Sequence, residues 1–237
     1  MSRRPLVLLV LLIAILAASC GGSQPTATPA AGATEGQSVS FRTDDGVVLQ
    51  GHLYGSGENG VVLAHMFPSD ERSWQDFAQA LAQHGFTALT FNFRGYPPSG
   101  GEQQIDKIDH DEAAAYAFLE GRGVKHIALA GASMGGTASI IVGSSKPIAA
   151  LITLSAPAEF RGLDASTAIR QVKAPALFVA SEADDGAAAA AQFFYSATAG
   201  PKELKIFTGD AHGTNLLTGD HAQEVRDLLL SFLSAHR

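Results

Sequence analysis

The chain has 237 residues, of which 46% are hydrophobic and 16% are charged, and its formal net charge is −7. This length and composition suit a single globular domain with a sizeable core. An acidic chain without a long run of Lys or Arg lacks the basic surface of a nucleic-acid-binding protein. Cys20 is the only cysteine, so an intrachain disulfide is excluded.

The N-terminal segment has the pattern of a targeting sequence. Arg3 and Arg4 precede an apolar stretch from residue 6 to residue 18. Small residues occupy positions 17–19, as in a cleavage site. This stretch is shorter than the about 20 residues of an ordinary membrane span. We therefore predict a signal peptide over residues 1–19 and an exported protein.

Leu16-Ala17-Ala18-Ser19-Cys20 resembles the lipobox of bacterial lipoproteins, with Ala17 where leucine is commoner. The resemblance implies that Cys20 carries lipid, becomes the mature N-terminus and holds the protein at the membrane. The alternative is ordinary signal-peptidase cleavage after Ser19, which leaves a free thiol. Residues 20–37 are rich in Gly, Ser, Thr, Pro and Ala, and this composition predicts a flexible linker.

Residues 38–237 contain alternating strand and helix patterns. A β-hairpin with a turn at Asp44-Asp45-Gly46 is expected first, formed by strands 38–43 and 47–54. The elements expected after it are strand 61–64, helix 74–82, strand 86–93, helix 107–119, strand 126–130, the helix that begins at Ser133, strand 149–154, strand 176–180, an alanine-rich helix from near Asp185, strand 204–207 and a terminal helix with an apolar stripe over 225–233. This order predicts an α/β fold with a mostly parallel eight-stranded sheet and helices on both faces.

Gly131-Ala132-Ser133-Met134-Gly135 lies between the strand pattern 126–130 and a helical segment. A serine at such a turn projects its hydroxyl from the sheet, and the first N–H groups of the helix point toward a site where an anion could form. The motif alone also fits an ordinary glycine-rich connection between a strand and a helix.

Two further chemically active residues follow strand patterns. Asp184 comes after strand 176–180, and His212 comes after strand 204–207. With Ser133, they stand in the chain order of the α/β-hydrolase superfamily, which the chain resembles over roughly residues 38–237. Only about residues 157–174 occupy the place where larger relatives insert a cap, so the resemblance implies a small, cap-less member similar to esterases and dienelactone hydrolases.

The resemblance implies a catalytic role for each of these side chains. Ser133 would be the nucleophile, His212 the base that accepts its proton, and Asp184 the carboxylate that orients the imidazole. Glu182 and Asp185 are rival carboxylates on the same loop. Asp184 is preferred because Ser181-Glu182-Ala183-Asp184 matches the usual pattern of the superfamily, a small residue three positions before the Asp.

His65-Met66-Phe67-Pro68 follows strand 61–64, where the superfamily commonly has His-Gly-X. The resemblance implies that the backbone N–H groups of Phe67 and Met134 form the oxyanion hole. We expect the side chains of Met66 and Phe67 to line an apolar substrate pocket, and His65 to brace its loop through a hydrogen bond.

Asn92-Phe93-Arg94-Gly95 resembles the Asp-x-Arg-Gly motif at a strand end in relatives, whose arginine is structural. We expect Arg94 to anchor loops by hydrogen bonds and to take no part in catalysis.

The sequence thus predicts a monomeric, membrane-anchored serine hydrolase that cleaves small carboxylic esters through an acyl-enzyme. No cofactor, metal or nucleic acid is expected, because metal-binding and nucleotide-binding motifs are missing from the sequence. An amidase, a peptidase or an acyltransferase would use the same residues, and a dienelactone-hydrolase-like activity is also open. A catalytically inactive hydrolase fold that serves as a binding lipoprotein is the alternative from another class, and Met66 favours it.

Overall fold

The computed structural model describes residues 36–237. The predicted signal peptide (1–19), Cys20 and the predicted linker as far as residue 35 lie outside the described residues. The first strand begins at Gln37, one residue before the expected start of the domain. No helix between residues 36 and 237 is long and apolar enough to cross a membrane.

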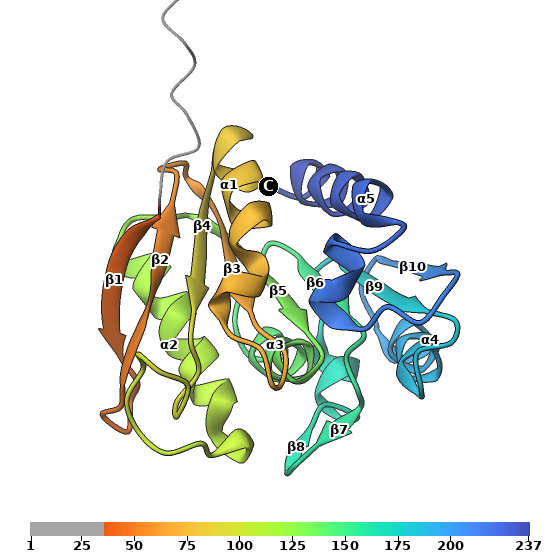
Figure 1. Ribbon diagram of the computed structural model, residues 1–237, viewed down its shortest axis with the longest axis horizontal. Coiled ribbons are helices and arrows are strands. Elements are labelled where there is room, and N and C mark those ends of the chain that lie inside the picture. Colours follow the sequence, from red (N-terminus) through yellow and green to blue (C-terminus); the bar gives the residue numbers. More distant parts are fainter. Residues whose placement is uncertain (1–35) are drawn as a thin grey trace, which may run out of the picture. The chain divides into compact units, whose positions relative to one another are not determined.

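The centre of the domain is an eight-stranded sheet with the strand order β1-β2-β4-β3-β5-β6-β9-β10 (Figure 1). Strand β2 runs antiparallel to both of its neighbours, and every other neighbouring pair is parallel, which confirms the predicted sheet. The strands are β1 (Gln37–Arg42), β2 (Val48–Tyr54), β3 (Asn59–Ala64), β4 (Phe86–Phe91), β5 (His126–Ala132), β6 (Leu151–Leu154), β9 (Ala176–Ser181) and β10 (Lys202–Phe207).

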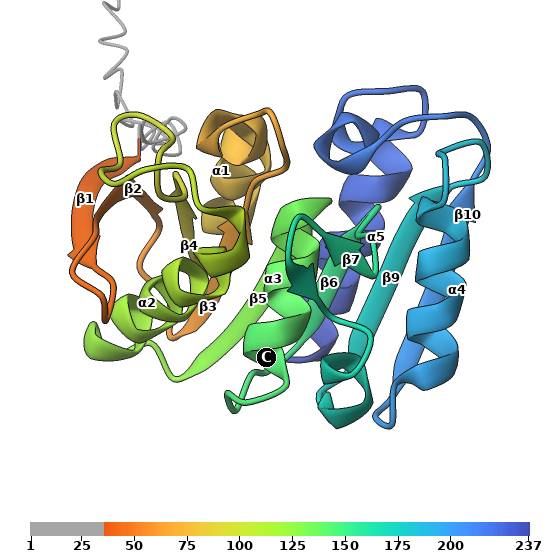
Figure 2. The ribbon, with the colours of Figure 1, turned by 90° about the horizontal axis from the view of Figure 1, so that it is seen from below.

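Within residues 36–237, five α-helices cover the sheet on both faces (Figures 1 and 2). They are α1 (Gln75–Gln83), α2 (Ile108–Gly121), α3 (Met134–Gly143), α4 (Ala187–Ala197) and α5 (Ala222–Ala235). The apolar residues of α2, α3 and α4 pack in one core cluster, and those of α1 and α5 pack in another on the opposite face. The central strands are apolar on both sides because helices cover both faces.

Several element boundaries differ from the expected ones by one or two residues, and two differences concern the loops near the candidate site. Strand β4 ends at Phe91, two residues early, because the N–H of Phe93 donates to Nε2 of His65 (3.2 Å) instead of continuing the ladder. A small hairpin that the sequence did not predict, β7 (Glu159–Phe160) and β8 (Leu163–Asp164), occupies the place of a cap. No large cap is present in the described domain, as expected.

Arg94 anchors the loops beside the sheet, in agreement with its expected structural role. Its buried guanidinium forms ion pairs with Asp45 (2.7 Å) and Asp111 (2.7 Å), which lie far apart in the sequence. Burial opposes its charge, but the hydrogen bonds to Asp111 and Asp45 outweigh burial and raise the pKa of Arg94. These contacts join the first hairpin turn to α2.

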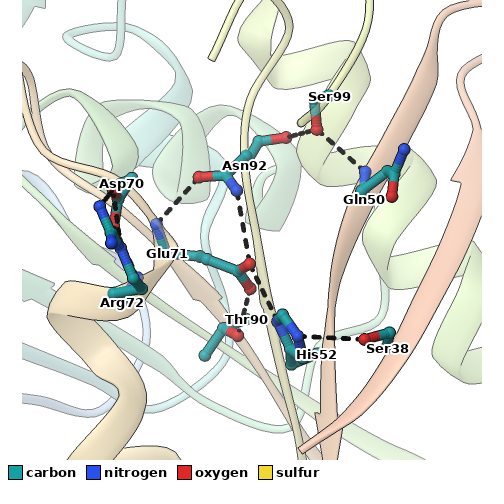
Figure 3. Close-up of polar contacts among 9 residues, drawn as sticks. All are labelled: Ser38, Gln50, His52, Asp70, Glu71, Arg72, Thr90, Asn92 and Ser99. Atoms are coloured by element: carbon teal, nitrogen blue, oxygen red, sulfur yellow. Dashed lines mark hydrogen bonds and ion pairs between the residues drawn. The ribbon is translucent and has the colours of Figure 1, made fainter. Parts of the chain in front are cut away.

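A polar network at the end of β4 fixes the short helical turn Glu71–Trp74, which follows the loop that contains Phe67 (Figure 3). The carboxylate of Glu71 accepts a hydrogen bond from the Thr90 hydroxyl (2.7 Å) and pairs with Nδ1 of His52 (2.9 Å). The N–H of Glu71 donates to the side-chain oxygen of Asn92 (3.0 Å), and the Asn92 carbonyl accepts from the Ser99 hydroxyl (2.6 Å). The network satisfies a buried carboxylate and ties the loop after β3 to the neighbouring strand.

A further buried carboxyl group, that of Glu112, lies between α2 and α3. Glu112 is fully buried, and its Oε1 lies 2.6 Å from the Ser139 hydroxyl, while its Oε2 has no hydrogen-bond partner among the described residues. Burial raises the pKa of Glu112 to about 8, with a smaller contribution from the charge of Asp109. The folded protein therefore keeps Glu112 protonated at neutral pH.

This carboxyl group makes stability depend on pH. The unfolded chain releases the Glu112 proton near the ordinary pKa of 4.5, whereas the raised pKa of about 8 lets the folded chain keep this proton. The free energy of unfolding therefore falls as the pH rises between these two values. We predict that Glu112→Gln raises the free energy of unfolding by roughly 1–3 kcal/mol at about pH 8 and by much less at about pH 5. Urea unfolding at both pH values measures this difference, and an equal pH dependence in both proteins would contradict it.

Candidate active site

Ser133 occupies a strained turn between β5 and α3. Its backbone angles are φ 49° and ψ −118°, and its N–H donates to the carbonyl of Leu154 on β6 (2.8 Å). A positive φ is costly for a residue with a side chain and persists only where the surroundings impose it. The turn presents the serine at the ends of β5 and β6.

The glycines of the motif allow this turn by permitting close backbone contacts. A Cβ on Gly131 would lie 2.4 Å from the carbonyl of Gly135, and a Cβ on Gly135 would lie 2.5 Å from the carbonyl oxygen of Ala64. Both distances are far shorter than any real contact of a Cβ atom. Glycine is therefore required at both positions for packing.

His212 and Asp184 lie side by side. Nδ1 of His212 is 2.8 Å from Oδ1 and 3.0 Å from Oδ2 of Asp184. The side chain of Asp184 is 8% exposed and that of His212 is 39% exposed, so the carboxylate is buried behind a reachable imidazole. In the described structure neither rival, Glu182 or Asp185, forms a hydrogen bond with His212.

Two contacts hold the loops of Asp184 and His212 together. The N–H of Ala183 donates to the carbonyl of Gly209 (2.9 Å), and the Ser181 hydroxyl donates to the carbonyl of Ala211 (2.8 Å). Since β9 and β10 are parallel neighbours, the loops after them leave the sheet at the same edge. Strand order therefore brings the loops of Asp184 and His212 together.

Ser133 and His212 line one cavity of about 590 Å³. Most of its other walls are apolar. The lining residues are Phe67, Ser133, Ser155, Pro157, Ala158, Phe160, Asp185, Gly186, Ala187, Ala189, Ala190, Phe193 and His212. A cavity of this size and polarity suits a small organic molecule.

The backbone N–H groups of Phe67 and Met134 are the oxyanion donors expected from the sequence. Within residues 36–237 neither N–H has a hydrogen-bond acceptor. Met134 is the first residue of α3, so the positive end of the helix dipole adds to its N–H, and Phe67 borders the same cavity as Ser133. Both donors are thus suited to bind a negative oxygen at the serine.

His65 braces the loop that carries Phe67. Its Nδ1 donates to the carbonyl of Met66 (2.9 Å) and its Nε2 accepts the N–H of Phe93 (3.2 Å). Burial lowers the pKa of His65 to about 4, so the ring is neutral near pH 7. These bonds agree with the bracing role expected from the sequence.

Met66 does not line the cavity, contrary to the expectation for its side chain. Its sulfur lies where a Cβ on Gly213 would approach to 2.7 Å, and its side chain packs against the core cluster of α1 and α5. The thioether fills the space left by the missing side chain of Gly213. Of the two expected pocket residues, only Phe67 borders the cavity.

Several lining residues were not singled out in the sequence. Ser155 follows β6, has φ 55° and carries a buried hydroxyl without a partner in the described domain. Its position after a strand is the only signal that could have indicated it. Phe160 and Phe193 reach the cavity from β7 and α4, and no local motif marks them.

Residues 36–237 contain no group of three His, Cys, Asp or Glu side chains arranged to hold a metal ion.

The close contacts at Gly135 can be tested by substitution. Gly135→Ala pushes a methyl group against the backbone of Ala64 and His65, so we predict that it lowers the free energy of unfolding by about 1–3 kcal/mol. Gly121→Ala is the matched control, because a Cβ there meets no atom within 4 Å and alanine favours the helix. Denaturant unfolding compares the two, and equal stability of both variants would contradict the packing role of Gly135.

Comparison with known proteins gives one family match and several similar proteins. A family model described as alpha/beta hydrolase fold matches residues 59–206. An uncharacterized protein of Mycobacterium tuberculosis is 27% identical over 218 residues, which cover 79% of this chain and 78% of that protein.

Among solved structures, the Pyrococcus furiosus esterase Pf2001 has a TM-score of 0.74 at 20% identity, over 85% of this chain and 93% of the esterase. A dienelactone hydrolase from Anabaena variabilis has a TM-score of 0.72 at 19% identity, over 85% of this chain and 98% of that structure. These two similarities show the fold alone.

Proposed function

Because the chain belongs to the α/β-hydrolase-fold family, we propose that it is a serine hydrolase that cleaves carboxylic esters through an acyl-enzyme. One observation carries the proposal. An imidazole paired with a buried carboxylate lies on the same cavity as a serine at a strained turn, beside two N–H groups that have no acceptor within residues 36–237. These are the parts that nucleophilic acyl transfer requires.

In the proposed reaction, Oγ of Ser133 attacks the ester carbonyl while Nε2 of His212 accepts the hydroxyl proton. Asp184 is hydrogen-bonded to Nδ1 of His212, so Nε2 is the ring nitrogen that accepts the proton. The carboxylate then stabilises the charged imidazole. In the described structure the Ser133 hydroxyl is not bonded to His212, and we expect this bond to form when substrate binds.

The N–H groups of Phe67 and Met134 then hold the oxyanion of the tetrahedral intermediate. His212 returns its proton to the leaving alcohol, and the acyl group stays on Ser133. A water molecule, activated in turn by His212, releases the acid and restores the enzyme.

The alternative of an inactive binding protein rested on Met66 in the oxyanion loop. The side chain of Met66 lies beside Gly213, and no acceptor in the described part of the chain binds the Phe67 N–H of the same loop. These observations favour the enzyme. We further propose that lipid on Cys20 holds the exported domain at the membrane, where it acts on small esters as a monomer.

Ser133→Ala tests the nucleophile. We predict that kcat for p-nitrophenyl butyrate falls by about 10⁶-fold, as in other serine triads, and that labelling by a fluorophosphonate probe is lost. Ser196→Ala, which removes an exposed hydroxyl on α4, should retain both activities. A folded wild-type protein that neither hydrolyses the ester nor reacts with the probe would favour the binding protein.

Asp184→Asn tests the choice among the three carboxylates of the loop. An amide at this position no longer stabilises the charged imidazole, so we predict a fall in kcat of about 10⁴-fold. The exposed rival Glu182 serves as control, and Glu182→Gln should leave kcat within about twofold of wild type. Comparable losses in the two variants would refute the assignment of Asp184.

A further inference from the structure

The hairpin β7–β8 carries an arginine in an unusual backbone conformation. Strands β7 and β8 pair through Phe160 and Leu163, so Arg161 and Gly162 form a two-residue loop, and their φ angles are 47° and 96°. Two successive positive φ angles are typical of a type I′ turn, where Asn, Asp and Gly are preferred over a long charged residue. A residue held in this conformation raises the question of a functional role.

The guanidinium of Arg161 packs against two aromatic rings that line the cavity, although Arg161 itself is not one of the lining residues. It is 4.2 Å from the ring centroid of Phe67 and 5.3 Å from that of Phe160, and the two rings are 6.1 Å apart. Both rings line the cavity that contains Ser133. Stacking on two rings restricts the guanidinium to one region, beside the rings that border the cavity and next to the residue of the proposed oxyanion donor.

The charge of Arg161 is not neutralised within the described part of the chain. Arg72 and Arg94 each form ion pairs with Asp side chains, whereas no carboxylate of residues 36–237 lies within 4.0 Å of Arg161. The residue is solvent-exposed, so its N–H groups can reach a ligand. A guanidinium offers a planar pair of donors that matches a carboxylate and binds it by two charge-assisted hydrogen bonds.

We propose that Arg161 binds a carboxylate carried by the substrate, so that the preferred substrates are esters with a free carboxylate a few bonds from the ester bond. This inference rests on the proposed esterase function. The apolar cavity holds the hydrocarbon between the two groups, and the rim at the hairpin holds the charge. Asp185, which also lines the cavity, repels the carboxylate and disfavours the opposite orientation.

Two matched esters test the proposal. One is monoethyl glutarate, and the other is the same ester with its carboxylate replaced by a neutral carboxamide. In a pH-stat assay at low salt, kcat/KM of the wild type should be at least about tenfold higher for the anionic ester, since charge-assisted hydrogen bonds are strong. Added salt should reduce this preference, because Arg161 is exposed.

Variants separate recognition of the carboxylate from a packing role of Arg161. Arg161→Gln should abolish the preference while kcat/KM for the carboxamide ester stays within about twofold, and Arg161→Lys should retain part of the preference. Arg122→Gln is the matched control, because the Arg122 guanidinium also stacks on a ring, that of Phe118 at 4.5 Å, away from the cavity residues. This control should keep the full preference.

Equal kcat/KM values of the wild type for the two esters would overturn this inference and leave the esterase function standing. An equal loss for both esters in Arg161→Gln would also overturn it, because such a loss indicates that Arg161 only supports the hairpin. Absence of hydrolysis of both esters, together with absence of fluorophosphonate labelling, would instead overturn the proposed function and this inference with it.

Discussion

The close approach of α3 to the strand ends is the constraint on which the candidate site depends. The carbonyl of Ala64 at the end of β3 lies where a side chain of residue 135 would otherwise stand, so only glycine lets the helix begin this close to the strand without a shift of the backbone. The chain then has to turn sharply at Ser133 and accept a positive φ. The strain is local, and the sheet and helix on either side of the turn impose it.

The same edge of the sheet collects the other parts of the site. Strands β3, β5, β6, β9 and β10 are parallel, so the loops that follow them lie together and bring Phe67, Ser133, Ser155, Asp184 and His212 to one edge. Each loop is short and is held by hydrogen bonds to a neighbouring loop or strand. A rigid scaffold of this kind allows chemistry to vary with the loops alone.

Two buried polar residues, His65 and Arg94, hold loops of the domain together and do not line the cavity. The neutral ring of His65 joins the Phe67 loop to the backbone after β4, and Arg94 joins the first hairpin turn to α2. Their hydrogen-bonding groups are satisfied, as burial requires. The cavity wall, by contrast, consists mainly of aromatic and small aliphatic side chains, and Arg161 stacks on the Phe67 ring that forms part of it.

The sequence by itself determined the alternation of strands and helices, the position of Ser133 between a strand and a helix, and the order of Ser133, Asp184 and His212, because periodicity and strand-end motifs are local. Tertiary structure decided which carboxylate pairs with His212. It also decided that Met66 packs against Gly213 and away from the cavity. Finally, it decided that Phe160 and Arg161 contact the Phe67 ring. These outcomes depend on side-chain directions and on contacts between segments far apart in the chain. Local patterns carry no information on such contacts, and the two-residue strands of β7–β8 are too short to form a pattern at all.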